Sequence, residues 1–343
     1  NLIGVEIFGS IQLAVVLLLM LGTAGLGVFG IVDIGTMNPS VVSEFNPFGW
    51  STVFQALAMG LWLFIGIEYV IPLGDEVKKP EKTIPKAMIC GLLTIFVVDM
   101  LFGFALTRHM DLATLSASAT PQIDGAIAIF GNMGGVIMSV LTLFAAVSTI
   151  NASFAAVPRM FYGLARQGLL PKAFKYIHPK FRTPSFGIIF VFLLFSLPLF
   201  VLESTITVFT TLLLSASVTW LITYIIAQVN VLILRKRYPN IERPFKAPFT
   251  PVIQIIGIAF CVYMIVTIHP DPTMKGTIYT IAFSLLLCIA AYAFIWLKYK
   301  KLPLFTPIAL EDMRQLKVDS ELPVDNLKTE VISVATSEKR VVR

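Results

Sequence analysis

Apolar residues in this chain gather into eight long runs separated by polar segments. A helix needs about 20 apolar residues to cross the hydrocarbon core of a membrane, so each run is a candidate transmembrane span. The sequence predicts a membrane domain at 1–301 with spans near 7–32, 51–73, 87–107, 126–160, 185–202, 206–234, 250–269 and 277–297. The remaining segment, 302–343, is polar and mixed in charge, and we expect it to be a mostly disordered tail.

The composition agrees with a membrane domain. Hydrophobic residues make up 57% of the chain and charged residues 13%, whereas a soluble domain carries about 25% charged residues. The predicted fold class is therefore an all-α polytopic membrane protein. The three cysteines all lie inside apolar runs, where they are more typical of small core residues than of a disulfide set or a metal site.

The positions of lysine and arginine predict the orientation. Eighteen of the 26 basic residues follow the second, fourth, sixth and eighth runs, while the alternate loops hold only Arg108 and Lys275. The positive-inside rule places the rich loops and the C-terminal tail in the cytoplasm, most simply at the plasma membrane. The second run then crosses from outside to inside. Because the net charge of +6 follows this topology, it does not indicate a nucleic-acid partner.

The second run, 51–73, contains an acid, Glu68, two residues after a glycine, Gly66. An ionised side chain at the bilayer centre costs about 2.5–3.5 kcal/mol on insertion scales, so such a residue is a functional candidate. Glycine between bulky residues is a plausible breaking point of the helix, and the backbone groups and half-helix ends at a break can bind the charged groups of a small zwitterion. The predicted substrate-binding residues are Trp62, Phe64, Ile65, Gly66 and Ile67. The alternative is a glycine that packs at a helix crossing, with aromatics facing lipid or core.

Two roles are open for Glu68, because it can carry a proton or hold the broken helix by hydrogen bonds. In the fourth run, small polar side chains either line a polar path or a sodium site, or join closely packed helices. These candidate path-lining residues are Ser148, Thr149, Asn151 and Ser153. Arg159, at the end of the fourth run, is the one basic residue within the bounds of a predicted span. No lysine falls inside a span, so the chain offers no fixed ammonium group in place of sodium.

Enzyme signatures are missing from the sequence. It contains no GxSxG, no HExxH and no phosphate loop ending in GK[ST]. We therefore expect a protein that is not an enzyme and that uses neither a cofactor nor a metal.

Three segments carry a family resemblance. WLFIGIEYV followed by GDEVKKPEKTIPKA is similar to the broken sixth helix, and the loop after it, of amino acid–polyamine–organocation permeases. The matching positions are Phe64, Gly66, Glu68, Glu76, Pro80, Ile84, Pro85 and Ala87. The segment NASFAAVPRMFYGLARQGLLPKAFKYIHPKFRTP resembles the eighth helix and its exit, and RKRYPNIERPFKAP resembles the loop after the tenth.

The resemblance covers about residues 1–300 and implies a leucine-transporter-like fold of two inverted repeats. The eight spans then correspond to helices five to twelve. It also implies that the first four helices are absent, including a broken first helix that supplies half of the substrate site. Because the chain begins at Asn1 without a methionine, we expect it to be a fragment.

The function implied by the resemblance is secondary active transport of amino acids, by proton symport or by exchange, with alternating access around Phe64–Glu68. The expected partners are an amino acid, the lipid bilayer and, as a candidate coupling ion, a proton. The alternatives are a polyamine or organocation transporter, a non-transporting sensor, or an inactive fragment of such a permease.

Overall fold

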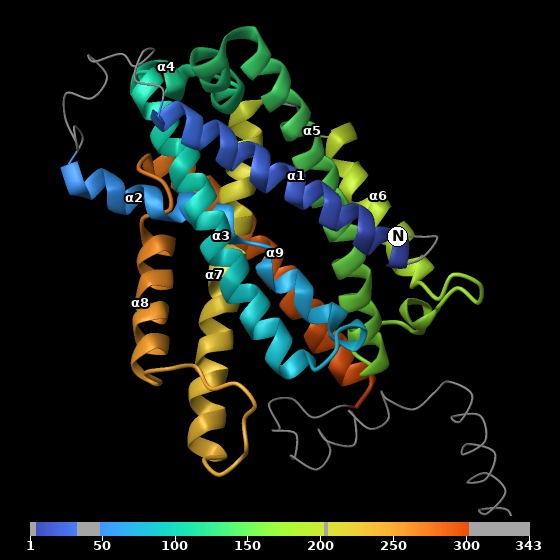
Figure 1. The fold of residues 1–343 in the computed structure, drawn as a ribbon. Coiled ribbons are helices and arrows are strands. Elements are labelled where there is room, and N and C mark those ends of the chain that lie inside the picture. The colour runs from blue at the N-terminus through green and yellow to red at the C-terminus, as the bar shows by residue number, and fades with distance from the viewer. Residues whose placement is uncertain (1–4, 33–48, 202–204, 302–343) are drawn as a thin grey trace, which may run out of the picture. The chain divides into compact units, whose positions relative to one another are not determined.

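The computed structural model describes residues 5–32, 49–201 and 205–301. Every regular element in these ranges is helical, which confirms the predicted all-α class (Figure 1). The elements are α1 (Val5–Val32), α2 (Gly49–Leu61), η3 (Trp62–Phe64), η4 (Ile67–Glu76), α3 (Pro80–His109), α4 (Leu112–Ala117), α5 (Pro121–Arg166), η5 (Lys172–Lys175), α6 (Ser185–Val201), α7 (Ile206–Arg237), α8 (Val252–Val266) and α9 (Pro272–Tyr299). The predicted tail, 302–343, lies outside the described residues.

Seven of the predicted spans each contain most of one α-helix, and the second contains α2, η3 and η4. Within the described ranges, five helices are long and apolar enough to cross a membrane: Ile11–Val32, Pro80–His109, Pro121–Arg166, Ile206–Arg237 and Pro272–Tyr299. Three shorter apolar helical stretches, Trp62–Gly74, Ser185–Pro198 and Val252–Val266, fall in the other predicted runs. The eight-span arrangement stays a prediction.

The length of the fourth run has a structural explanation. At Gly131 the backbone of α5 turns out of the helical region, with φ 64° and ψ −157°, so α5 is two helices joined at a kink. Glycine adopts this positive φ without a Cβ clash. Just before α5, the Asp111 side chain caps α4 by accepting hydrogen bonds from the hydroxyl and backbone N–H of Thr114, and these bonds lower the pKa of the Asp111 carboxyl group.

The helices up to Ala290 pack as two groups. In the first, α1 lies against α3 and α5 (Figure 1), around a core of Leu26, Phe102, Ala126, Met138 and Leu141. The approach of α1 to α3 is close, because a Cβ at Gly27 would lie 2.8 Å from the backbone nitrogen of Phe102. The second group packs α7 on α8, with a core that also includes Ile278 and Ala282 of α9.

The second run connects these two groups. Its first part, α2, packs against α7 and α8, whereas its last part, η4, packs against α3 and α5. The residues between α2 and η4 therefore lie where a movement of one group relative to the other would act on the chain.

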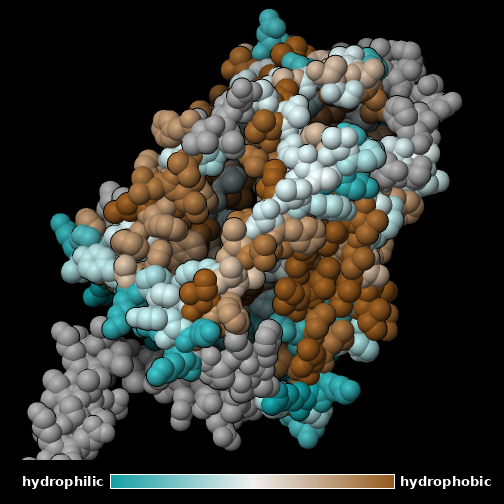
Figure 2. All heavy atoms as spheres, turned by 180° about the vertical axis from the view of Figure 1, so that it is seen from behind, coloured by the Kyte–Doolittle hydropathy of each residue, from teal (hydrophilic) through white to brown (hydrophobic). Residues whose placement is uncertain are grey.

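Apolar side chains cover wide areas of the outer surface (Figure 2). Leu21 and Leu287, for example, are each 71% exposed. Soluble monomers rarely expose apolar patches larger than a few hundred Å², so these faces are suited to contact with lipid. The end of α9 from Ala291 belongs to a second compact unit, in which Tyr292 stacks on Trp296 and the Lys300 ammonium lies over the Trp296 ring.

Candidate functional site

The helix of the second run breaks at Gly66, as the sequence predicted. After α2 and the single turn η3, Ile65 is extended, with φ −69° and ψ 140°, and Gly66 is left-handed, with φ 104° and ψ −8°. A Cβ built on Gly66 would meet no atom within 4 Å. Glycine is therefore required here by the backbone conformation and not by close packing, which argues against the alternative of a packing glycine.

After the break the chain continues as η4, a 3-10 helix that contains Pro72. Its first turn is closed by the hydrogen bond from the Tyr69 backbone N–H to the Gly66 carbonyl, 3.0 Å long. Runs of 3-10 helix longer than three or four residues are uncommon, and proline has no backbone N–H to donate. The sequence predicted an apolar run of helix here, and the observed segment is more tightly wound and irregular.

The Glu68 carboxylate joins this break to α7. Its Oε2 accepts from the Gly66 backbone N–H and from the Tyr224 hydroxyl, each at 3.1 Å, and its Oε1 accepts from the Trp220 indole N–H. In each of these bonds Glu68 is placed as the acceptor. The acid that the sequence singled out is thus fully engaged with the break and with α7.

Sequence reasoning missed Trp220 and Tyr224 as partners of Glu68. They lie four residues apart on α7, so one face of the helix presents both side chains. The signal was present, because buried tryptophan and tyrosine usually find a hydrogen-bond partner for their polar atom. Trp220 also contacts Trp62 edge-on, with ring centroids 6.1 Å apart.

The other predicted binding residues surround the break. Trp62, Phe64, Ile65, Gly66 and Ile67 are all half-buried. Ile67 reaches toward α3, where its Cδ1 lies 3.2 Å from the position of a Cβ built on Gly91. Its side chain therefore packs between helices, and the residues best placed to contact a ligand are those from Trp62 to Gly66.

The polar residues of α5 divide into two sets. Ser148 and Asn151 are joined to Gln12 of α1: the Gln12 amide nitrogen donates to Ser148 Oγ at 2.6 Å, and the Asn151 amide nitrogen donates to Gln12 Oε1 at 3.0 Å. Gln12, a polar residue inside the first apolar run, was not singled out from the sequence. This set acts as a polar link between α1 and α5.

The second set lies beside η4. Ser153 is buried, donates to the Thr149 carbonyl at 2.9 Å and is a hydrogen-bond partner of the Tyr69 side chain, next to Glu68. The Thr149 side chain is exposed. The structure thus places Ser153 near the Glu68 site and Ser148 and Asn151 toward α1.

Metal ligation has no evident basis in the part of the chain that the structure describes. There, no three side chains of histidine, cysteine, aspartate or glutamate gather into a group that could hold a metal ion.

The fold and the site together define a class: a polytopic α-helical membrane protein with an interrupted helix that carries an engaged acid. A family model described as amino acid permease matches residues 1–297. The chain belongs to the amino acid permease family, and the resemblance seen in the sequence is confirmed.

Several curated proteins are similar to the chain. The methylthioribose transporter of Bacillus subtilis (strain 168) is 29% identical over 247 residues, which are 68% of this chain and 50% of that protein. The serine/threonine exchanger SteT of the same organism is 29% identical over 272 residues, 76% of this chain and 58% of the exchanger. The D-serine/D-alanine/glycine transporter of Escherichia coli (strain K12) is 26% identical over 302 residues, which are 82% of this chain and 63% of that transporter. The chain spans about half to two thirds of the length of these relatives.

Proposed function

We propose that this chain supplies one half of the moving core of a secondary amino acid transporter, with alternating access around the interruption at Phe64–Glu68. The observation that carries the proposal is the break itself. It joins two separately packed groups of helices, and it is held to α7 by a single carboxylate. Two of the relatives described above are named for amino acids, and serine appears in both names.

The break suits the cationic end of an amino acid. The C-terminal end of a helix carries partial negative charge on its carbonyl groups, and α2 with η3 ends directly at Ile65. The α-ammonium group of the substrate would bind these carbonyls, and Trp62 and Phe64 would contact its side chain. The Gly66 N–H is already bonded to Glu68, so the substrate carboxylate needs another helix N-terminus. The proposed core therefore requires further helices, such as those of a first repeat, to complete the site.

Of the two roles open to Glu68, we propose that it holds the broken helix. In the three hydrogen bonds described above, the Glu68 carboxylate is the acceptor. Protonation of Glu68 would replace one acceptor oxygen with a donor. Exchange of one amino acid for another needs no proton carrier, so exchange is the proposed coupling and proton symport the alternative. The distribution of lysine and arginine supports a cytoplasmic C-terminus in the plasma membrane.

A second substrate class follows from one relative. The first protein named above is a methylthioribose transporter, and a neutral thio-sugar could bind backbone carbonyls through its hydroxyl groups. A polyamine is less favoured, because it calls for several acids along the path and the acid at this break is engaged. A sensor would bind an amino acid without moving it across the membrane, and an inactive fragment would not transport.

Substrate protection of a cysteine at the break tests where the ligand binds. In the protein expressed from its complete reading frame, Cys90, Cys261 and Cys288 are replaced with alanine and Ile65→Cys is introduced. We expect serine at ten times its dissociation constant to slow labelling by a small thiol reagent about tenfold, because occupied protein is shielded. Thr273→Cys, at an exposed position in the first turn of α9, is the control and should label at the same rate with and without serine.

The outcome also separates the candidate substrates. Protection by methylthioribose alone would replace the amino acid with a thio-sugar as the substrate. Unchanged labelling of Ile65→Cys in the presence of both compounds would contradict a substrate site at the break.

A further inference from the structure

The segment between α5 and α6, residues 167–184, carries a concentrated positive charge. It contains four basic residues, and the sequence holds no aspartate or glutamate between Asp124 and Glu203. Three of the four are lysines with exposed side chains: Lys172, Lys175 and Lys180. The positive-inside rule predicts that this segment lies on the cytoplasmic side, which is the side of the leaflet that holds the anionic lipids.

Aromatic packing holds the first half of this segment in place. Phe174 of η5 has its ring centroid 5.4 Å from that of Phe161 on α5. The same ring lies 5.0 Å from that of Phe186 and 5.2 Å from that of Phe190, both on α6. Because Phe174 is directed toward the two helices, the lysines at the ends of η5 stay at the surface.

Hydrogen bonds fold the second half of the segment. The His178 backbone N–H donates to the Thr183 carbonyl at 2.9 Å, and the Arg182 backbone N–H donates to the His178 carbonyl at 2.8 Å. The His178 Nδ1 accepts from the Lys180 backbone N–H at 3.2 Å, and the Lys180 ammonium lies 5.5 Å from the centroid of the Phe181 ring. The lysines are thus presented by a folded loop, so a partner that binds them has few further groups to order.

Exposed apolar side chains lie next to these lysines. Tyr176 is 51% exposed and Ile177 is 36% exposed. The segment leads directly into α6, which packs against α5 and leaves Phe192 and Leu193 more than half exposed on its outer side. The lysines therefore lie where an apolar surface suited to lipid begins, and tyrosine is enriched at this level of a membrane protein.

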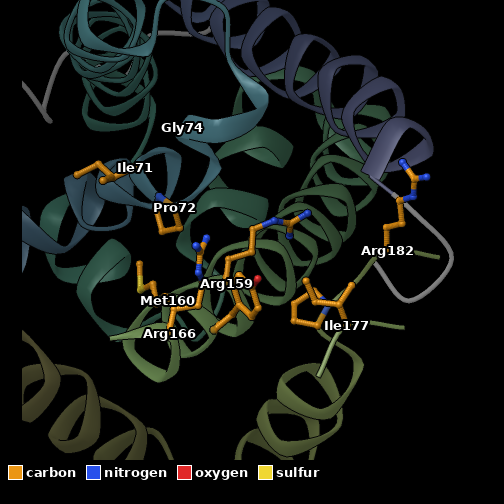
Figure 3. Close-up of a pocket in the computed structure, with 11 residues that line it drawn as sticks. Ile71, Pro72, Gly74, Arg159, Met160, Arg166, Ile177 and Arg182 are labelled. Atoms are coloured by element: carbon orange, nitrogen blue, oxygen red, sulfur yellow. The ribbon is translucent and has the colours of Figure 1, made fainter. Parts of the chain in front are cut away.

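The segment also forms one wall of a cavity of about 430 Å³, whose other walls come from η4 and the C-terminal end of α5 (Figure 3). Ile177 and Arg182 belong to this wall. Figure 3 shows Arg182 apart from the arginines of α5. A partner that holds the segment would therefore also hold the wall beside η4, the element that follows the break at Gly66.

We propose that residues 167–184 bind the anionic phospholipid surface of the cytoplasmic leaflet, through Lys172, Lys175 and Lys180. Each lysine close to such a surface contributes about a fivefold gain in binding. Tyr176 lies among the headgroups, where its ring contacts apolar groups and its hydroxyl contacts water. The bound lipids hold the inner end of α5 and the cavity wall beside η4.

A fluorescent label at Tyr176→Cys tests the proposal. The protein, expressed from its complete reading frame with its other cysteines replaced by alanine, carries a dye whose emission moves to shorter wavelength in less polar surroundings. It is reconstituted into phosphatidylcholine vesicles that contain a rising fraction of phosphatidylglycerol. We expect the emission to move to shorter wavelength as this fraction rises, and high salt to reverse the change, because salt screens exposed charges.

The lysine variant should lose most of this response. Lys172→Gln/Lys175→Gln/Lys180→Gln removes the three proposed contacts, so it should require at least about tenfold more phosphatidylglycerol for the same change in emission. Size-exclusion chromatography checks that the variant is folded. If it is not, Lys172→Gln/Lys175→Gln keeps the contacts of Lys180 within the loop and should still require several times more phosphatidylglycerol.

A matched variant separates this segment from general basic charge. Lys236→Gln/Arg237→Gln/Lys246→Gln removes three exposed positive charges from the end of α7 and the loop after it. With the label at the same position, this variant should respond to phosphatidylglycerol like the protein that keeps all of its lysines.

Three results would overturn the proposal. Equal responses of the lysine variant and the α7 variant would show that only the total charge matters. The same emission at every phosphatidylglycerol fraction would show that the segment does not contact anionic lipid. An emission already at short wavelength in detergent, and moved to longer wavelength when residues 302–343 are removed, would make the chain's own C-terminal segment the partner of this surface.

Discussion

Replacing Glu68 with alanine is expected to reduce amino acid exchange by at least about a hundredfold. The substitution removes the shared acceptor of three donors: the Gly66 N–H, the Trp220 indole and the Tyr224 hydroxyl. A buried donor left without a partner costs about 1–3 kcal/mol. Three such losses at the lower end of this range sum to about 3 kcal/mol, and each 1.4 kcal/mol is a factor of ten. The measurement is exchange of labelled serine by proteoliposomes, with size-exclusion chromatography as the check of folding.

The conservative variant separates the two roles of Glu68. Glu68→Gln keeps one acceptor oxygen, so under the proposed holding role it should retain measurable exchange at every pH. If Glu68 carries a proton, Glu68→Gln should instead abolish uptake driven by a proton gradient. Tyr224→Phe removes one of the three donors and keeps the ring, and we expect it to lower exchange by no more than about tenfold. Wild-type exchange by Glu68→Ala would contradict any role for this carboxylate.

Gly66→Ala is expected to produce the second large effect, on both stability and transport. Gly66 has φ 104°, a region that residues with a Cβ rarely occupy, and holding such a residue there costs about 1–3 kcal/mol. The space around the glycine is open, so the cost comes from the backbone alone. The chain should respond by shifting the break, which would move the Glu68 carboxylate away from α7. Thermal unfolding and serine exchange measure the two consequences.

Gly60→Ala provides the matched control for Gly66→Ala. Gly60 lies within α2, six residues before Gly66, and a Cβ there also meets no atom within 4 Å. Its backbone is helical, and alanine is the better helix former by about 1 kcal/mol. We therefore expect Gly60→Ala to unfold at the same temperature as the wild type or higher. If Gly60→Ala and Gly66→Ala lowered the unfolding temperature and serine exchange equally, the left-handed conformation at Gly66 would not be needed.

Much of the fold follows from local patterns in the sequence. The apolar runs place the long helices because length and composition decide which segments suit a membrane. The break at Gly66 could also be predicted, since a glycine close to an acid inside an apolar run is unfavourable for an intact helix. The 3-10 winding of η4 and the kink at Gly131 could not, because glycine and proline permit several backbone conformations and packing selects one of them.

The partners within the site depend on distant contacts. Trp220 and Tyr224 lie about 150 residues from Glu68 along the chain, so no local pattern pairs them. The same holds for Gln12, which bonds Ser148 and Asn151 across 136 and 139 residues. The polar residues of α5 form two sets because they point to different sides of the helix, and the helices packed on each side decide the partners of each set. Ser148 and Asn151 face α1, whereas Ser153 packs beside η4.

Countertransport in proteoliposomes tests the central claim most directly. The protein, expressed from its complete reading frame, is reconstituted into vesicles with or without internal unlabelled serine, and labelled serine is added outside. We expect rapid uptake only into preloaded vesicles, at a rate that a pH gradient does not change. No serine uptake into preloaded vesicles, by protein shown to be folded, would contradict the claim that this chain forms part of an amino acid exchanger.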